Sequence, residues 1–211
     1  MLALGIQRQG RDIRRRRPAY RSDGTATTPQ DRRLNGYSPV MAPAPPTPGP
    51  EINLTQVSLL VRDVEATMRA YHAAFGWGPW AIYELRAPVL HDVKVLGAPA
   101  QCDMLAAIAP AGGVDIEVFQ PLSPGPLADL LEHRGEGLHH ICCRRADGAD
   151  ADLDASLRGL SGTAPVVEGT VGTNLTFSYI DLQDSLKAVV ETLAGAVETT
   201  GEPDRIWPSS S

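Results

Sequence analysis

The sequence predicts an α+β protein in which one βαβββ module occurs twice. Residues 51–122 show the apolar patterns of a strand, a helix and three further strands, and residues 137–195 repeat that order. In each copy, a polar residue of the first strand also precedes an aspartate by seven positions. These pairs are Gln56 with Asp63 and His140 with Asp147. An internal repeat with matched spacing indicates that the two halves of the chain fold alike.

The elements of the first module follow from local patterns. Apolar positions predict a strand over 54–61, and Asp63 after it is a suitable cap for the next helix. In that helix apolar residues recur every three or four positions, and Gly76 is expected to end it. The three remaining strands are expected at 80–85, 103–109 and 114–119.

The second module is reached through a linker, 123–136, that contains a predicted helix at 126–134. A strand is expected at 138–144, and Asp147 is expected to cap the helix after it. Leucines spaced by three or four positions mark one face of that helix. Further strands are expected at 166–171, 175–181 and 186–192.

The two ends of the chain differ from the modules. Residues 1–50 carry 9 Arg, 3 Asp and 8 of the 18 Pro, with no Phe or Trp. This composition predicts a disordered Arg/Pro-rich extension, although an arginine cluster such as 14–17 is also compatible with nucleic-acid or membrane binding. We also hypothesise that translation starts at Met41, which an intact mass of the native protein would test. Residues 196–211 are interpreted as a C-terminal tail.

Composition excludes several classes of protein. The chain has 211 residues and a net charge of −6, and without its basic extension the remainder carries 10 basic and 22 acidic residues. Such an acidic body argues against a nucleic-acid-binding domain. No apolar run is long enough to span a membrane, and three cysteines make no disulfide framework. We therefore expect a cytoplasmic protein with no nucleic-acid or membrane partner.

Four polar residues hold matched places in the two modules. Gln56 and His140 lie in the first strands, whereas Glu117 and Glu191 lie amid apolar residues of the last strands. Taken singly, each has an ordinary interpretation, such as a solvated glutamate or a hydrogen-bonded core histidine. Together, one imidazole and three oxygen donors suit a divalent ion such as Zn²⁺, Co²⁺, Mn²⁺, Ni²⁺ or Fe²⁺. The predicted metal site is therefore Gln56, Glu117, His140 and Glu191.

Four segments of the chain resemble sequences of one known superfamily. They are 56–63, 75–80, 116–122 and 135–141. They resemble the vicinal oxygen chelate superfamily, which includes glyoxalase I, methylmalonyl-CoA epimerase, extradiol dioxygenases and bleomycin-resistance proteins. The resemblance covers residues 53–193 and implies paired modules that form a cupped mixed sheet around one divalent ion. It assigns the ligand positions to the same four residues and implies that His139 points to the opposite face of its strand.

The resemblance also implies a reaction. The implied enzyme is a metal-dependent isomerase, epimerase or glyoxalase-type lyase that transfers a proton next to a carbonyl through an enolate, with Glu191 as the base. The segments are epimerase-like and the ligand set is glyoxalase-like, whereas Gln56 departs from the histidine of ring-cleaving dioxygenases. The second base of epimerases corresponds here to Leu105. Asp103, two residues earlier on the same strand face, is therefore the candidate second acid or base.

Two alternatives stay open beside this hypothesis. The same cup would serve a ligand-binding or resistance protein without turnover, or a cyclase or isomerase of specialised metabolism. The expected partner is a small carbonyl or thioester substrate, and the resemblance makes a homodimer possible. Coenzyme A binding would require basic residues near the cup, for which Arg62, Arg86, Lys94 and Arg134 are the candidates.

Overall fold

The computed structural model describes residues 49–195 and 201–208, so the predicted disordered extension lies almost wholly outside the described residues. The helices are α1 (Val64–Phe75), α2 (Pro126–Arg134) and α3 (Asp150–Ser161). The strands of the first half are β1 (Ile52–Leu60), β2 (Trp80–Leu85), β3 (Leu90–Val95), β4 (Ala98–Pro99), β5 (Met104–Pro110) and β6 (Asp115–Pro121). Those of the second half are β7 (Gly137–Arg145), β8 (Val167–Val171), β9 (Leu175–Leu182), β10 (Ala188–Ala194) and β11 (Arg205–Trp207).

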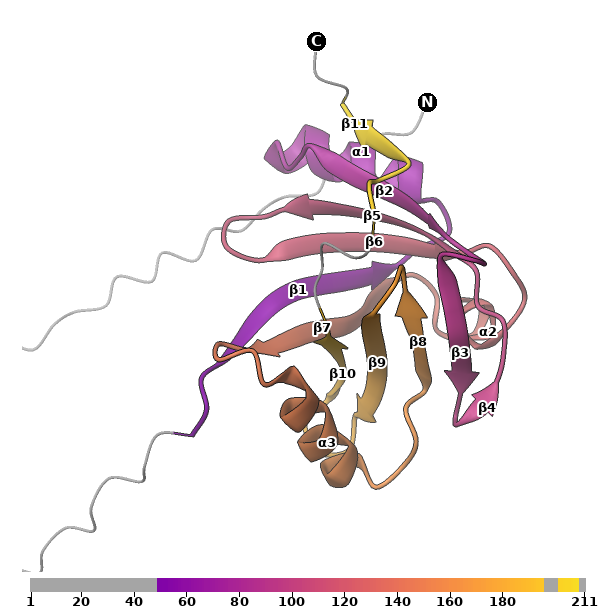
Figure 1. Cartoon of the computed structure of the whole chain (residues 1–211). Coiled ribbons are helices and arrows are strands. Elements are labelled where there is room, and N and C mark those ends of the chain that lie inside the picture. Colours follow the sequence, from indigo (N-terminus) through magenta and orange to yellow (C-terminus); the bar gives the residue numbers. More distant parts are fainter. Residues whose placement is uncertain (1–48, 196–200, 209–211) are drawn as a thin grey trace, which may run out of the picture. The chain divides into compact units, whose positions relative to one another are not determined.

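Within the described residues, all strands belong to one mixed sheet, in the order β11-β2-β5-β6-β1-β7-β10-β9-β8-β3-β4 (Figure 1). In each module the first and last strands pair in parallel, β1 with β6 and β7 with β10. The two modules join through the antiparallel pair of β1 and β7. The predicted fold class, two βαβββ modules in a cupped mixed sheet, is confirmed.

A short connection shows why the sheet must curl. In the sheet order β2 and β3 are eight neighbour steps apart, which is about 38 Å along a flat sheet. In the chain only four residues, Arg86 to Val89, separate them, and such a connection spans at most about 18 Å. The two regions of the sheet therefore approach each other, and Figure 1 shows β3 standing beside β8.

Helix α1 forms as its sequence predicts. Asp63 has extended backbone dihedrals, and its side chain accepts a hydrogen bond from the Ala66 N–H at 2.9 Å. Gly76 ends the helix in the left-handed conformation at φ 72°, which glycine adopts without steric cost. Val64 and Met68 are buried in an apolar cluster with residues of β2, β5 and β6. Burial of this apolar stripe holds the helix against the sheet.

Helix α3 begins later than predicted, because Asp147 is not its cap. The N-cap residue is Ala149, and the first helical residue is Asp150. Asp147 instead pairs with Arg145 and accepts a hydrogen bond from the Ala149 N–H at 3.1 Å. These contacts hold Asp147 in the turn before the helix, so it is not available at the helix terminus.

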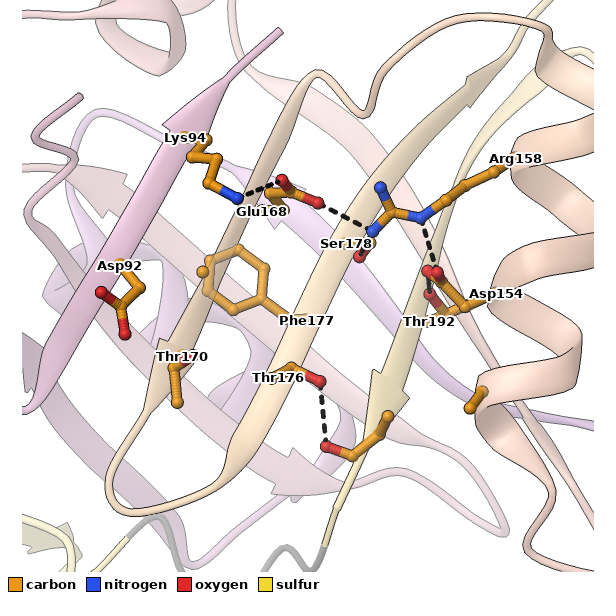
Figure 2. A pocket seen from close by; sticks show the side chains of 13 residues that line it. Asp92, Lys94, Asp154, Arg158, Glu168, Thr170, Thr176, Phe177, Ser178 and Thr192 are labelled. Carbon is orange, nitrogen blue, oxygen red and sulfur yellow. Dashed lines mark hydrogen bonds and ion pairs between the residues drawn. The ribbon is translucent and has the colours of Figure 1, made fainter. Parts of the chain in front are cut away.

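The face beneath α3 combines apolar and polar contacts: Leu157 packs against Ile180, Leu182 and Val190, and a polar groove lies beside them. Figure 2 shows Arg158 reaching from α3 toward Ser178 of β9 and Glu168 of β8, into a groove of about 350 Å³. Arg158 donates hydrogen bonds to Asp154 at 2.5 Å and to Glu168 at 2.8 Å. It also donates to Ser178 at 2.6 Å, while the Thr192 hydroxyl donates to Asp154 at 2.6 Å. An ion-pair network thus helps to hold α3 against strands β8 to β10 of the second module.

Replacing Arg158 by methionine is expected to lower the free energy of unfolding by about 1–3 kcal/mol, because two partly buried carboxylates lose their partner. Urea unfolding measures the loss. The control is Arg86→Met, since Arg86 and Glu84 form a pair whose side chains are 53% and 54% exposed and whose loss should cost less than about 1 kcal/mol. Equal losses in both variants would contradict a structural role for the Arg158 network.

Three strands were not predicted. The β3–β4 hairpin lies between β2 and β5 in the chain but pairs with β8 of the second module. A bulge between His91 and Lys94 breaks its two-residue alternation, which removes the usual strand signal. β11 lies in the predicted C-terminal tail and pairs with β2. Its Trp207 packs on α1, where the Arg69 guanidinium lies 4.7 Å from the ring centroid.

Candidate active site

A cavity of about 460 Å³ is lined by strands of both modules. One wall comes from β2 and β5, and another from β8 and β9. Side chains of β1, β6 and β10 carry most of its polar groups. Gln56, Glu117 and Glu191, three of the four predicted site residues, line this cavity. A cavity of this size matches the clefts that hold small molecules.

Glu117, His140 and Glu191 are brought together at one point. His140 Nε2 lies 3.3 Å from Glu191 Oε2 and 3.7 Å from Glu117 Oε2. His140 is 1% exposed, Glu191 6% and Glu117 8%. Two carboxylates and an imidazole are therefore desolvated together, which is costly without a compensating charge.

The strand register explains why these side chains converge. On the parallel pair β1–β6, Glu117 lies opposite Ser58, two residues beyond Gln56. On the parallel pair β7–β10, Glu191 lies opposite Cys142, two residues beyond His140. The offset is the same in both modules, so the matched places inferred from the repeat are also matched in space. Gln56 shares the cavity with the cluster.

Ser58 and Cys142 hold a second pair of matched places. The buried Ser58 hydroxyl donates a hydrogen bond to Glu117 Oε2. Cys142 is fully buried and lies opposite Glu191 in the strand register. Burial, together with the charge of Glu191, raises the pKa of Cys142 far above its usual range. Ser58 thus orients Glu117, Cys142 holds the equivalent place beside Glu191, and Cys142 stays a protonated thiol.

We expected His139 to point to the face of its strand opposite His140, but it lies on the same side as His140. The register between β1 and β7 shifts between Ser58 and Leu59, so His139 is the extra residue of a bulge. Its Nδ1 lies 2.7 Å from Nδ1 of His140, and one of these atoms donates its proton to the other. Burial lowers the pKa of His139 to about 3. His139 is therefore neutral near pH 7 and can accept a proton from His140 in this hydrogen bond.

The Glu117 carboxyl has a strongly altered affinity for protons. Burial raises its pKa from the ordinary 4.5 to about 7. This value is the net of opposing effects: the charge of Glu191 also raises the pKa, whereas His140 and the hydrogen bond from Ser58 lower it. Without a bound cation, Glu117 therefore carries a proton over part of the neutral range.

This pKa predicts how the stability of the ion-free protein depends on pH. The folded chain retains a proton on Glu117 that the unfolded chain releases above about pH 4.5. The contribution of Glu117 to the free energy of unfolding is therefore largest below pH 4.5. It falls as the pH rises to about 7, by about 1.4 kcal/mol per unit.

Urea unfolding of chelator-treated protein between pH 4.5 and 8 measures this slope. Glu117→Gln cannot titrate, so the difference between the two proteins isolates the effect of this carboxyl. Parallel curves for the wild type and Glu117→Gln would show that Glu117 keeps its ordinary pKa.

The donor set fits a divalent cation by two observations. His140 Nε2 is buried without a hydrogen-bond partner in the part of the chain that the structure describes. Two donors about 2.1 Å from one ion stand about 3.0–3.6 Å apart at angles of about 90–120°, and the measured 3.3 and 3.7 Å lie close to that range. Among residues 49–195 and 201–208, no three His, Cys, Asp or Glu side chains are arranged to hold an ion as they stand. Binding would therefore draw the carboxylates closer.

Asp103, the expected second acid or base, does not reach the cavity. Met104, Ala106 and Ile108 are the residues of β5 that line it, whereas Leu105 packs on the α1 side. Asp103 lies two residues before Leu105 and so belongs to the same face of the chain. Its side chain accepts a hydrogen bond from Gln101 at 2.9 Å, outside the cavity. Leu105 was therefore assigned to the wrong face of β5. Asp103, which lies on the same face as Leu105, was wrongly expected to reach the cavity.

Other polar groups do reach the cavity. Asp115 lines it from the start of β6, opposite Gln56 in the register. Tyr179 also lines it, and its ring centroid lies 4.4 Å from that of His140. Asp115 was not singled out from the sequence, although its two-residue spacing from Glu117 places both on one face of the strand.

The paired modules and their shared cluster of buried donors define a protein of the vicinal oxygen chelate type. The sequence matches the Glyoxalase/Bleomycin resistance protein/Dioxygenase superfamily over residues 55–176, more than half of its length, and the chain belongs to this superfamily. No curated protein is similar enough to match.

Several solved structures are similar to the chain. A hypothetical protein from Bacillus halodurans C-125 is 15% identical, with a TM-score of 0.49 over 69% of this chain and 95% of its own. Methylmalonyl-CoA epimerase from Mycobacterium tuberculosis is 21% identical, with a TM-score of 0.42 over 68% and 87%. Another methylmalonyl-CoA epimerase is 20% identical, with a TM-score of 0.44 over 68% and 94%.

No helix in residues 49–195 and 201–208 combines the length and apolar character needed to span a membrane.

Proposed function

We propose that the protein is a divalent-metal-dependent enzyme that moves a proton at a carbon next to a carbonyl, as an isomerase, an epimerase or a glyoxalase-type lyase. One observation supports this proposal above others: the buried His140 Nε2 faces Glu117 and Glu191 and has no hydrogen-bond partner among residues 49–195 and 201–208. A lone pair placed between two carboxylates is poorly satisfied without a cation. His140, Glu117, Glu191 and Gln56 would hold the ion.

The roles of the residues follow from their surroundings. When bound, such an ion acts as a Lewis acid that polarises a carbonyl oxygen and offsets the negative charge that develops beside it. Glu191 is the candidate base, since it is buried, lines the cavity and lies 3.3 Å from His140 Nε2. Glu117, held by Ser58, contributes charge without being free to turn. Asp115 is the other carboxylate in reach and replaces Asp103 as the candidate second proton carrier.

Metal titration tests this proposal directly. Chelator-treated protein should bind about one ion per chain on titration with Zn²⁺, Co²⁺, Mn²⁺ or Ni²⁺. His140→Ala should lose that binding, whereas His133→Ala, a change to the exposed histidine of α2, should keep it. Loaded protein should also exchange deuterium from solvent into the α-position of a panel of α-hydroxyketones and thioesters. Equal metal binding by both variants would contradict the proposed site.

A ligand-binding protein without turnover is the second candidate. It is favoured by the protonation of Glu117 near neutral pH, because a neutral carboxyl bonded to Ser58 needs no cation. In that case the purified protein would take up none of the four ions and would bind its ligand equally well after chelator treatment. The same titration therefore distinguishes the two functions.

A further inference from the structure

We propose that the substrate of this site is an electrically neutral, largely apolar molecule, and not a coenzyme A or glutathione conjugate; this inference rests on the proposed function. The first observation is the chemistry of the cavity walls. Beyond the polar cluster, both modules present mainly aliphatic and aromatic side chains to the cavity. They include Leu85, Leu90, Met104, Ile108, Leu175 and Leu193.

The second observation is the charge around the cavity. Among the described residues that line it, Arg144 is the single cation, against Asp115, Glu117 and Glu191. Arg144 is already neutralised, because its Nε and Nη2 donate to Asp150 Oδ2 at 2.9 and 2.6 Å. Away from the Glu117–His140–Glu191 cluster, where the proposed ion would bind, a phosphate or carboxylate on the substrate would therefore find no unpaired cation among the described residues that line the cavity.

The third observation concerns the wall formed by β2. Tyr83 lines the cavity, and its pKa is raised by burial and by the charges of Glu202 and Asp204. These two acids belong to the segment that precedes β11. They add negative potential close to the cavity, which disfavours an approaching anion.

The basic residues expected to serve coenzyme A do not line the cavity, and three of the four are paired with carboxylates. Arg62 pairs with Glu132 at 2.6 Å, Arg86 with Glu84 at 2.8 Å and Lys94 with Glu168 at 3.4 Å. Neither these three nor Arg134 line the cavity. A nucleotide handle extending from the cavity would thus find each of these three cations already paired with a carboxylate.

A fluorescent neutral probe tests the inference on the full chain. 3-Hydroxyflavone is uncharged and apolar, and it carries a hydroxyl beside a carbonyl. We expect it to bind the protein with or without Zn²⁺, more tightly with the ion. Equal concentrations of acetyl-CoA or S-hexylglutathione should not displace it. Ile108→Lys, which places a charge on the cavity wall, should weaken its binding at least tenfold.

The control variant is Leu186→Lys, at a 53% exposed position before β10, which should bind the probe within twofold of the wild type. Ile108→Trp fills the cavity without adding charge and serves if Ile108→Lys does not fold. Displacement by either anionic conjugate, or no binding of the probe at all, would overturn the inference. Probe binding that persists while metal titration fails would leave the inference standing and remove the proposed metal chemistry.

Discussion

Replacing Glu191 by glutamine is expected to lower the rate of α-proton exchange by about 10²–10⁴-fold, the usual contribution of a general base. Glutamine keeps the shape of the side chain and an oxygen that can still bind a cation, but it cannot accept a proton. Metal affinity should therefore fall much less than turnover. Deuterium incorporation, followed with metal binding on the same preparations, measures both quantities.

A control variant shows whether the effect is specific to Glu191 or follows from replacing any glutamate in a strand. Glu84 lies on β2, is exposed and does not line the cavity, so Glu84→Gln should retain the exchange rate. If Glu191→Gln kept both metal binding and turnover, Glu191 would not be the base, and the proposed mechanism would be wrong.

Replacing His139 by phenylalanine is expected to weaken metal binding about 10–100-fold, the usual cost of removing the hydrogen-bond partner of a ligand histidine. For His140 Nε2 to bind a cation, its proton must sit on Nδ1, and that proton is then donated to His139 Nδ1 at 2.7 Å. Phenylalanine fills a similar space between Phe119 and Tyr179 but offers no acceptor. The buried N–H of His140 would lose its partner.

Two measurements would test whether His139 acts through this hydrogen bond. In ¹⁵N NMR spectra of the Zn²⁺-loaded wild type, His140 should carry its proton on Nδ1. His139→Asn restores an acceptor and should recover part of the metal affinity, whereas His139→Leu should not. Equal affinities for His139→Phe, His139→Asn and the wild type would show that His139 only fills space.

Much of the fold could be predicted because its signals are local. The Asp63 cap, the apolar stripe of α1 and the Gly76 stop all lie within a few residues of the helix that they define. The matched places of Gln56 with Glu117 and of His140 with Glu191 were also predictable. Gln56 and His140 each precede an aspartate by seven positions, and Glu117 and Glu191 each lie amid apolar residues of the last strand of a module. Parallel pairing within each module then brings the residues of a pair to the same offset.

The remaining features depend on contacts between distant segments. The bulge at His139 exists because β7 must pair with β1 across about 80 residues of sequence. Asp103 was misplaced because the face of β5 is set by its pairing with β2 and β6. The hairpin formed by β3 and β4 acquires its partner, β8, from the other module. None of these pairings has a signature within its own segment.

The four residues between β2 and β3 also limit what the cavity can admit. Leu85 and Leu90, at the two ends of this connection, both face the cavity, so the same short tether ties two opposite parts of its rim. While β3 stays paired with β8, this connection limits how far the two parts of the rim can separate. Binding affinity should therefore fall sharply once a ligand exceeds the width of the cavity entrance, instead of declining gradually with ligand size.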